Sequence, residues 1–203
     1  MGKIAIAGNP NSGKTTVFNT LSGRNERVGN WAGVTVMKKE ARLRRRFARH
    51  NQNTIIVDLP GAYSMKAYTN DELEATNFLQ NEHIDVIINI IDASNLERSL
   101  FFTLQLVDTG IPVIVALNKS DITKRKKTKI DSKMLKEKLG VKGVHFTQAT
   151  SGKGLKEIVD DALDQIIEGE YRGQKPKKKR KHQRHYFRNS EKRCKCKQNN
   201  IDR

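Results

Sequence analysis

The chain has 203 residues, enough for one domain with a sizeable core and one additional segment. Its 39 Lys and Arg residues outnumber 22 Asp and Glu residues, and the net charge of +17 points to polyanionic partners without indicating a fold. The two cysteines, Cys194 and Cys196, exclude a disulfide framework in the rest of the chain and favour a reducing compartment.

Short apolar runs alternate with helical patterns over residues 1–170, which is typical of a three-layer α/β fold with a mostly parallel sheet and helices on both faces. Six strands are expected, at Ile4–Ala7, Val34–Leu43, Thr54–Leu59, Val86–Asp92, Pro112–Asn118 and Val144–Thr147. The second and third of these form an antiparallel edge pair. Helices are expected from near Gly13, over Thr69–Gln80, along the face of Leu96, Leu100, Leu104 and Val107, over Asp131–Leu139, and from Leu155 to Ile166.

The C-terminal segment, residues 171–203, has a different composition, with 14 Lys and Arg residues against 2 acidic ones. It has almost no apolar side chains to bury, so we expect a disordered basic tail. Two targets stay open for this tail, an anionic lipid surface and RNA. The longest apolar runs, 86–91 and 111–117, are too short to span a bilayer, which predicts a soluble chain with no transmembrane segment.

The strongest motif follows the first expected strand. It fits the phosphate-loop pattern G-x-x-x-x-G-K-[ST] and opens a helix, which is the context the pattern requires. In such a loop the backbone N–H groups surround the β-phosphate, Lys14 contacts the β- and γ-phosphates, and the Thr15 hydroxyl binds Mg²⁺. The predicted nucleotide contacts here are Gly8, Asn9, Pro10, Asn11, Ser12, Gly13, Lys14, Thr15 and Thr16.

Two further motifs follow expected strands. The first is Asp58-Leu59-Pro60-Gly61, in which the Asp58 carboxylate can hold Mg²⁺ through water and the Gly61 N–H can meet a γ-phosphate. The second is Asn118-Lys119-Ser120-Asp121, in which the Asp121 carboxylate can accept both guanine donors, N1–H and the exocyclic amine, so that GTP is preferred over ATP. The three motifs in this order predict a GTPase of the translation-factor class.

More specific segments accompany these motifs. They are Val28-Gly29-Asn30-Trp31-Ala32-Gly33-Val34-Thr35, Asp58–Ser64, and Ile91-Asp92-Ala93-Ser94-Asn95-Leu96-Glu97-Arg98. With the phosphate loop they resemble the N-terminal G domain of the ferrous-iron transport protein B family over about residues 3–167. The resemblance implies nucleotide contacts from Gly33, Val34 and Thr35, with Thr35 as a Mg²⁺ ligand. It also implies that the turn Ala149-Thr150-Ser151 contacts the guanine oxygen.

Two positions in the sequence bear on catalysis, Ala62 and Asn11. Ras-type enzymes orient the attacking water with a glutamine after the Asp-x-x-Gly glycine, whereas this chain has Ala62, which has no polar group. The resemblance implies that Asn11 is a K⁺ ligand and that the loop Gly29–Gly33 covers the ion with carbonyl groups. The predicted catalytic set is therefore Lys14, Asn11, Thr35 and Gly61, acting with GTP, Mg²⁺ and K⁺.

The family's helical and membrane-spanning parts have no counterpart in this sequence. We therefore expect a G domain, residues 1–170, that hydrolyses GTP in the cytoplasm and is associated with ferrous iron transport. An iron permease subunit at the inner face of the membrane is one expected partner. Two alternatives stay open, an RNA- or ribosome-associated assembly GTPase and a slow GTP-dependent binding switch.

Overall fold

The computed structural model describes residues 2–23, 26–30, 37–48, 53–66, 69–125 and 129–171. All of them lie in one compact unit, Met1–Gly173. The strands are β1 (Gly2–Gly8), β2 (Glu26–Asn30), β3 (Met37–Arg42), β4 (Thr54–Asp58), β5 (Val86–Asp92), β6 (Val113–Asn118) and β7 (Gly143–Phe146). The helices are α1 (Lys14–Ser22), α2 (Asn70–Asn81), α3 (Leu96–Asp108), α4 (Ser120–Arg125), α5 (Ser132–Leu139) and α6 (Leu155–Tyr171), with a short 3₁₀ turn at Ala93–Asn95.

The strands form one sheet in the order β2-β3-β4-β1-β5-β6-β7. From β4 to β7 the neighbours are parallel, whereas β2, β3 and β4 pair antiparallel. The α/β class, the mostly parallel sheet and the antiparallel pairing of β3 with β4 are confirmed. The sheet has one strand more than the predicted six. This strand, β2, has the sequence Glu-Arg-Val-Gly-Asn with a single apolar side chain, because an edge strand needs no continuous apolar run.

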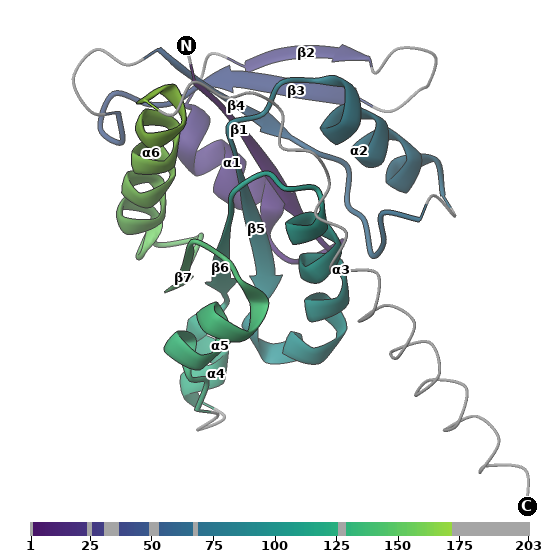
Figure 1. Ribbon diagram of the computed structural model, residues 1–203. Coiled ribbons are helices and arrows are strands. Elements are labelled where there is room, and N and C mark those ends of the chain that lie inside the picture. The colour runs from purple at the N-terminus through teal and green to yellow at the C-terminus, as the bar shows by residue number, and fades with distance from the viewer. Residues whose placement is uncertain are drawn as a thin grey trace, which may run out of the picture. The chain divides into compact units, whose positions relative to one another are not determined.

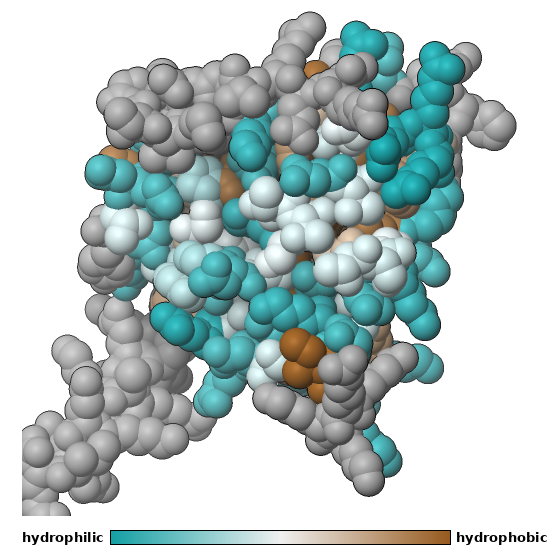
Figure 2. Space-filling view, turned by 180° about the vertical axis from the view of Figure 1, so that it is seen from behind, coloured by the Kyte–Doolittle hydropathy of each residue, from teal (hydrophilic) through white to brown (hydrophobic). Residues whose placement is uncertain are grey.

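Helices cover both faces of the sheet, as Figure 1 shows, and each face has its own apolar cluster. Successive residues of β1 point to opposite faces, so Ile4 and Ile6 join the cluster with α1 and α6, and Ala5 and Ala7 join the one with α2, α3 and α5. The outer surface visible in Figure 2 is mostly hydrophilic, with only small separate hydrophobic areas. The three-layer prediction is therefore confirmed.

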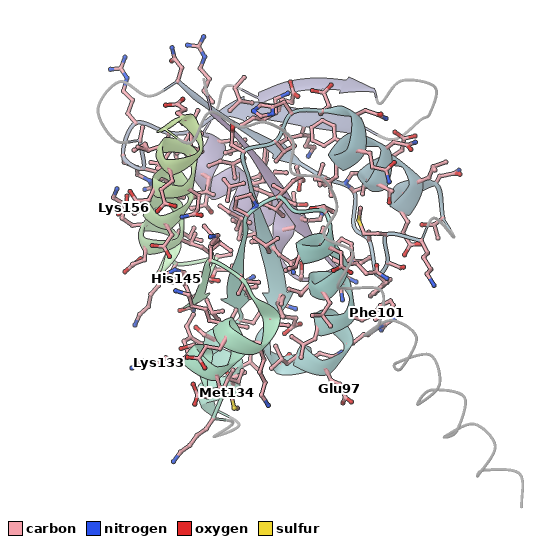
Figure 3. All side chains as sticks on the ribbon, viewed as in Figure 1. Glu97, Phe101, Lys133, Met134, His145 and Lys156 are labelled. Carbon is pink, nitrogen blue, oxygen red and sulfur yellow. The ribbon has the colours of Figure 1, made fainter. Side chains whose placement is uncertain are left out.

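The inner face of α3 is only partly the predicted one. Leu96, Leu100 and Val107 pack against the core as expected, but Leu104 is 39% exposed. Three polar side chains, Ser99, Thr103 and Gln105, are buried beside Phe102 and Leu106. Outward-pointing Phe101, labelled in Figure 3, is 48% exposed. The apolar pattern did not predict these buried polar side chains, because hydrogen bonds compensate their burial. Asn89 Nδ2, for example, donates to Thr103 Oγ1 at 2.8 Å.

The carboxyl ends of β1, β4, β5 and β6 lie at one edge of the sheet, because these strands are parallel. The segments that follow them are the phosphate loop, Asp58–Gly61, the turn after Asp92, and Asn118–Asp121. Open α/β sheets bind their ligands at this edge. The register therefore brings together motifs that are far apart in sequence, such as Gly8–Thr15 and Asn118–Asp121.

Candidate functional site

The phosphate loop joins β1 to α1 with the glycine conformations that the motif requires. Gly13 has φ +94°, and a Cβ there would collide with the Asn118 amide nitrogen. Asn11 also has a positive φ, +63°, which asparagine tolerates better than most residues. The loop is closed by a hydrogen bond from the Ser12 N–H to the Asn9 carbonyl at 3.2 Å. This geometry leaves the first N–H groups of α1 at a helix N-terminus suited to a phosphate.

Lys14 and Asp58 face each other at the centre of the site. Lys14 Nζ lies 3.6 Å from Asp58 Oδ1, and each side chain is only about a tenth exposed. The cation matches a phosphate, and the carboxylate is a hard oxygen donor that suits Mg²⁺. Thr15, the first-turn residue that follows Lys14, adds a hydroxyl oxygen of the same kind. The donor chemistry of this part of the site therefore fits a magnesium nucleotide.

Asn118 connects the phosphate loop to the loop after β7. Its Nδ2 donates to the Ser12 carbonyl at 2.9 Å, and its Oδ1 accepts from the Ala149 N–H at 3.0 Å. The side chain is 3% exposed, so both bonds are shielded from water. The sequence predicted a nucleotide contact for Asn118, and the structure gives it a cross-linking position between two predicted contact segments.

Lys119 makes a second connection, with its backbone at φ +58°. Its Nζ donates to the Asn11 carbonyl at 3.0 Å and to Asp92 Oδ2 at 2.6 Å. Burial raises the pKa of the Asp92 carboxyl, but the hydrogen bonds from Lys119 and Ser94 outweigh it and lower the pKa below its usual 3.8. The ends of β5 and β6 are thereby tied to the phosphate loop.

The predicted base-reading residues lie on two neighbouring segments. Asp121 is in the first turn of α4, a helix that the sequence pattern did not reveal. The start of α4 is joined to the end of the β7 segment, because the Ser120 N–H donates to the Thr147 carbonyl at 3.3 Å. Ala149 is buried, whereas Thr150 and Ser151 are exposed in the turn that follows. The structure therefore places the two predicted base-reading segments next to each other.

The segment Asp58–Gly61 lies directly against the phosphate loop. A Cβ on Gly61 would come within 3.1–3.2 Å of Pro10 atoms, including its backbone. The next residue, Ala62, donates its N–H to the Gly8 carbonyl at 3.3 Å and is 1% exposed. Its methyl group packs in the apolar cluster with α2 and α3, so position 62 faces the core and offers no polar group to a water.

The sequence analysis missed the residues that hold the segment after Gly61 in place. Glu72, in the first turn of α2, was not among the predicted site residues, yet its Oε1 accepts from the N–H groups of Tyr63 and Ser64, both at 3.1 Å. Thr69 caps α2 at the N-terminal end of the predicted range, since its Oγ1 accepts from the Glu72 N–H at 3.2 Å. The available signal was an acid on the buried side of an amphipathic helix, where a lone charge is costly unless it has partners.

Part of the predicted site, namely Gly33, Val34 and Thr35, lies outside the described residues. The loop predicted at Gly29–Gly33 begins differently from the expectation, because Gly29 and Asn30 belong to β2 and pair with Lys38 and Met37. Pairing with β3 gives these residues backbone partners, so the strand continues where a loop was expected. Within the described ranges, no cluster of three or more His, Cys, Asp or Glu side chains could hold a metal ion, and no helix has the length and apolarity to cross a membrane.

Comparisons with known proteins agree with this geometry. A family model described as ferrous iron transport protein B matches residues 2–162. The Fe(2+) transporter FeoB of Salmonella typhimurium is 45% identical over 159 residues, which is 76% of this chain and 20% of the transporter. The chain thus spans about a fifth of the length of the curated relatives it matches.

Solved structures of the same kind are also similar. A mutant of the S. thermophilus NFeoB bound to GDP has a TM-score of 0.74 and 44% identity, covering 80% of this chain and 61% of that chain. The cytosolic domain of the T. maritima FeoB iron transporter in its GMPPNP form has a TM-score of 0.75 and 36% identity, covering 81% of this chain and 63% of that chain.

Proposed function

The chain belongs to the ferrous-iron transport protein B family, and on that premise we propose that it binds GTP and hydrolyses it to GDP and phosphate. The observation that carries the proposal is the cross-linked set of strand-end loops. Asn118 and Lys119 join the phosphate loop to the segments that would read the base, so one ligand can contact all of them. Relatives of this chain have been solved with GDP and with GMPPNP, which supports the choice of ligand.

The residues of the chain have separable roles in this reaction. Lys14 and the phosphate-loop N–H groups bind the phosphates, and Gly61 N–H donates to the γ-phosphate. Water attacks the γ-phosphorus, a new P–O bond forms, and the bond to the bridging oxygen of GDP breaks. Mg²⁺, held by Thr15, Thr35 and, through water, Asp58, would neutralise the charge that develops on the phosphate oxygens. Because Ala62 faces the core, its side chain does not orient the water.

A monovalent cation would supply charge that no side chain at position 62 provides. We assign the ligand role to the Asn11 side chain, which lies on the exposed surface of the phosphate loop. The Asn11 carbonyl is held by Lys119 at 3.0 Å, which fixes the backbone that carries this side chain. Hydrolysis is then faster in KCl than in NaCl at equal ionic strength, and Asn11→Ala removes the difference. Equal rates in the two salts would refute the cation role.

The role in the cell follows from the family. We propose that the domain acts in the cytosol and is associated with ferrous iron transport, through an iron permease as its partner. Co-purification with such a permease, dependent on the bound nucleotide, would support this assignment. Equal recovery of the permease with GDP and with GMPPNP would argue against nucleotide control.

The nucleotide assignment is tested by changing the base-reading residue. Asp121→Asn replaces an acceptor-only carboxylate by an amide that presents a donor, so the variant loses affinity for GTP and gains affinity for xanthosine triphosphate. Calorimetry with both nucleotides measures the exchange. Asp71→Asn, the same chemical change at an exposed position in the first turn of α2, is the matched control and leaves the preference for guanine. Unchanged GTP affinity in Asp121→Asn would remove Asp121 from the base site.

A further inference from the structure

Helix α3 holds both segments that would face the γ-phosphate. Toward the phosphate loop, Asn9 Nδ2 donates to Ser99 Oγ at 3.2 Å. Toward the segment after Gly61, Gln105 Oε1 accepts from the Met65 N–H at 2.6 Å and from Ser64 Oγ at 3.2 Å. These α3 side chains are buried, so the contacts are built into the fold. The helix is therefore a common support for two loops whose relative position decides how a γ-phosphate is bound.

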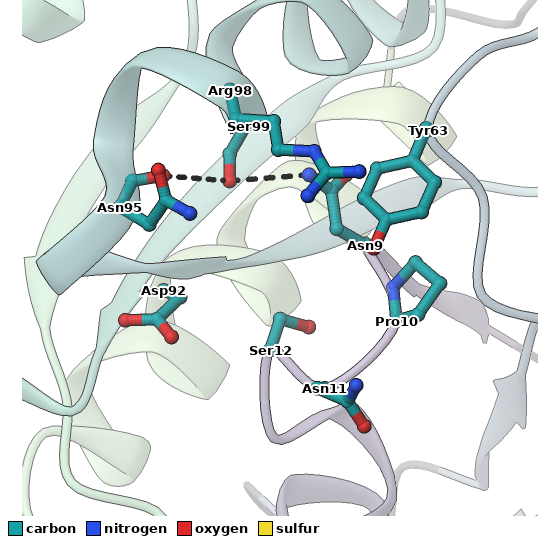
Figure 4. A pocket seen from close by; sticks show the side chains of 9 residues that line it. All are labelled: Asn9, Pro10, Asn11, Ser12, Tyr63, Asp92, Asn95, Arg98 and Ser99. Carbon is teal, nitrogen blue, oxygen red and sulfur yellow. Dashed lines mark hydrogen bonds between the residues drawn. The ribbon is translucent and has the colours of Figure 1, made fainter.

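Arg98, in the first turn of α3, makes a different contact at the same place. Its guanidinium carbon lies 4.2 Å from the centre of the Tyr63 ring, within the range of a cation–π interaction. Both side chains line a polar pocket that the phosphate-loop residues Asn9, Pro10 and Asn11 complete. Figure 4 shows Arg98 and Tyr63 side by side, with Pro10 next to the ring. The stack thus lies at the junction of α3, the phosphate loop and the Asp58–Met65 segment.

Tyr63 is well placed to transmit this contact to the nucleotide site. It lies two residues after Gly61, and Gly61 is packed so closely against Pro10 that a Cβ would come within 3.1 Å of it. The Ala62 side chain between them faces the core, whereas Tyr63 is 37% exposed and lines the pocket. The ring is the part of the Asp58–Met65 segment that Arg98 contacts.

We propose that Arg98 is a positioning residue for GTP hydrolysis, because its stack on Tyr63 fixes the Gly61 N–H at the distance from the phosphate loop that the transition state requires. This inference rests on the proposed function of the same site. The hydrogen bonds from Glu72 and Gln105 fix the backbone of the segment from the side of α2 and α3. Arg98 acts instead on the exposed side chain, so it can influence the rate without contributing much to the stability of the fold.

The experiment is a double-mutant cycle between Arg98→Ala and Tyr63→Ala, measured as kcat and KM for GTP and as affinity for GDP. Each single variant lowers kcat by about two- to thirtyfold, the rate equivalent of one cation–π contact. GDP affinity stays within about twofold, because GDP lacks the γ-phosphate that Gly61 contacts. The double variant is no slower than the slower single variant, since each substitution removes the same stack. Multiplying effects in the double variant would overturn the proposal.

Two matched variants separate positioning from general damage. Tyr63→Phe keeps the ring and retains most of the rate, whereas a loss equal to that of Tyr63→Ala would refute stacking as the cause. Arg46 stacks on Phe47 at 4.7 Å in the turn between β3 and β4, at the edge of the sheet opposite the nucleotide site. Arg46→Ala therefore removes a comparable contact, and the proposal requires that it leave kcat unchanged.

A measurement without nucleotide distinguishes failure of this inference from failure of the proposed function. Hydrogen exchange of the amides in residues 59–66 reports the mobility of the segment directly. Exchange is faster in Arg98→Ala than in the wild-type chain or in Arg46→Ala, and equal exchange would overturn the inference. A wild-type chain that neither binds nor hydrolyses GTP would instead refute the proposed function.

Discussion

Asn118 offers a strict test of how the site is assembled. Replacing it by alanine removes both buried hydrogen bonds, to the Ser12 carbonyl at 2.9 Å and from the Ala149 N–H at 3.0 Å. A buried backbone group left without a partner costs about 1–3 kcal/mol, so two such groups cost about 2–6 kcal/mol. We expect the lower half of that range, because the two loops can relax toward water. Such a loss is a large share of a domain stability of about 5–15 kcal/mol.

Asn118→Asp sharpens the test, because it keeps the shape and the acceptor for Ala149 but faces the Ser12 carbonyl with an anionic oxygen. Burial and this repulsion raise the pKa of the new carboxyl, so its penalty is greatest above that raised pKa. When the pH falls through this raised pKa, the carboxyl becomes protonated and donates to the Ser12 carbonyl. The stability of the variant relative to the wild type then recovers. Asn118→Ala shows no such recovery.

Urea unfolding at several pH values measures these free energies of unfolding. Asn81→Ala, an exposed substitution on the last turn of α2, is the control and changes stability by less than about 0.5 kcal/mol. A cost for Asn118→Ala no larger than that of the control would show that the cross-link does not hold the loops together. A pH-independent deficit in Asn118→Asp would refute the hydrogen-bond account.

Three further predictions concern other parts of the chain. Glu72→Ala removes the acceptor of a buried N–H, that of Ser64, and of a part-buried one, that of Tyr63, which can turn to water. It lowers the free energy of unfolding by about 1–3 kcal/mol, the cost of one buried group, whereas Glu72→Gln keeps an acceptor and loses less, as urea unfolding would show. The pKa of Asp92 is lowered in the folded chain, so the ionised carboxyl stabilises the fold fully above its usual pKa of 3.8. This stabilisation is lost as the pH falls through the lowered pKa. Asp92→Asn therefore has a shallower loss of stability on acidification. Removing residues 174–203 leaves thermal unfolding and GTP binding unchanged, because Met1–Gly173 has its own core, and weakens polyanion binding together with its salt dependence.

The local chemistry of the site could be predicted from the sequence. The phosphate loop, the Asp58–Gly61 segment and the Asn118–Asp121 segment are contiguous motifs, each set by a strand end, and continuous apolar runs identified the central strands. Parallel strands end at one edge, so these motifs had to meet there. The edge strand β2 and helix α4 were missed, because neither has the apolar periodicity that such predictions depend on.

The connections between the motifs were decided only by the tertiary structure. The bond from Asn118 to Ser12 joins residues 106 apart, and the contact of Gln105 with Met65 joins residues 40 apart. Hydrophobic patterning assigns polar side chains such as Ser99, Gln105 and Glu72 to solvent, since it carries no information about a distant partner. They are buried because the folded chain provides those partners, and a buried polar group is stable only where its hydrogen bonds are made.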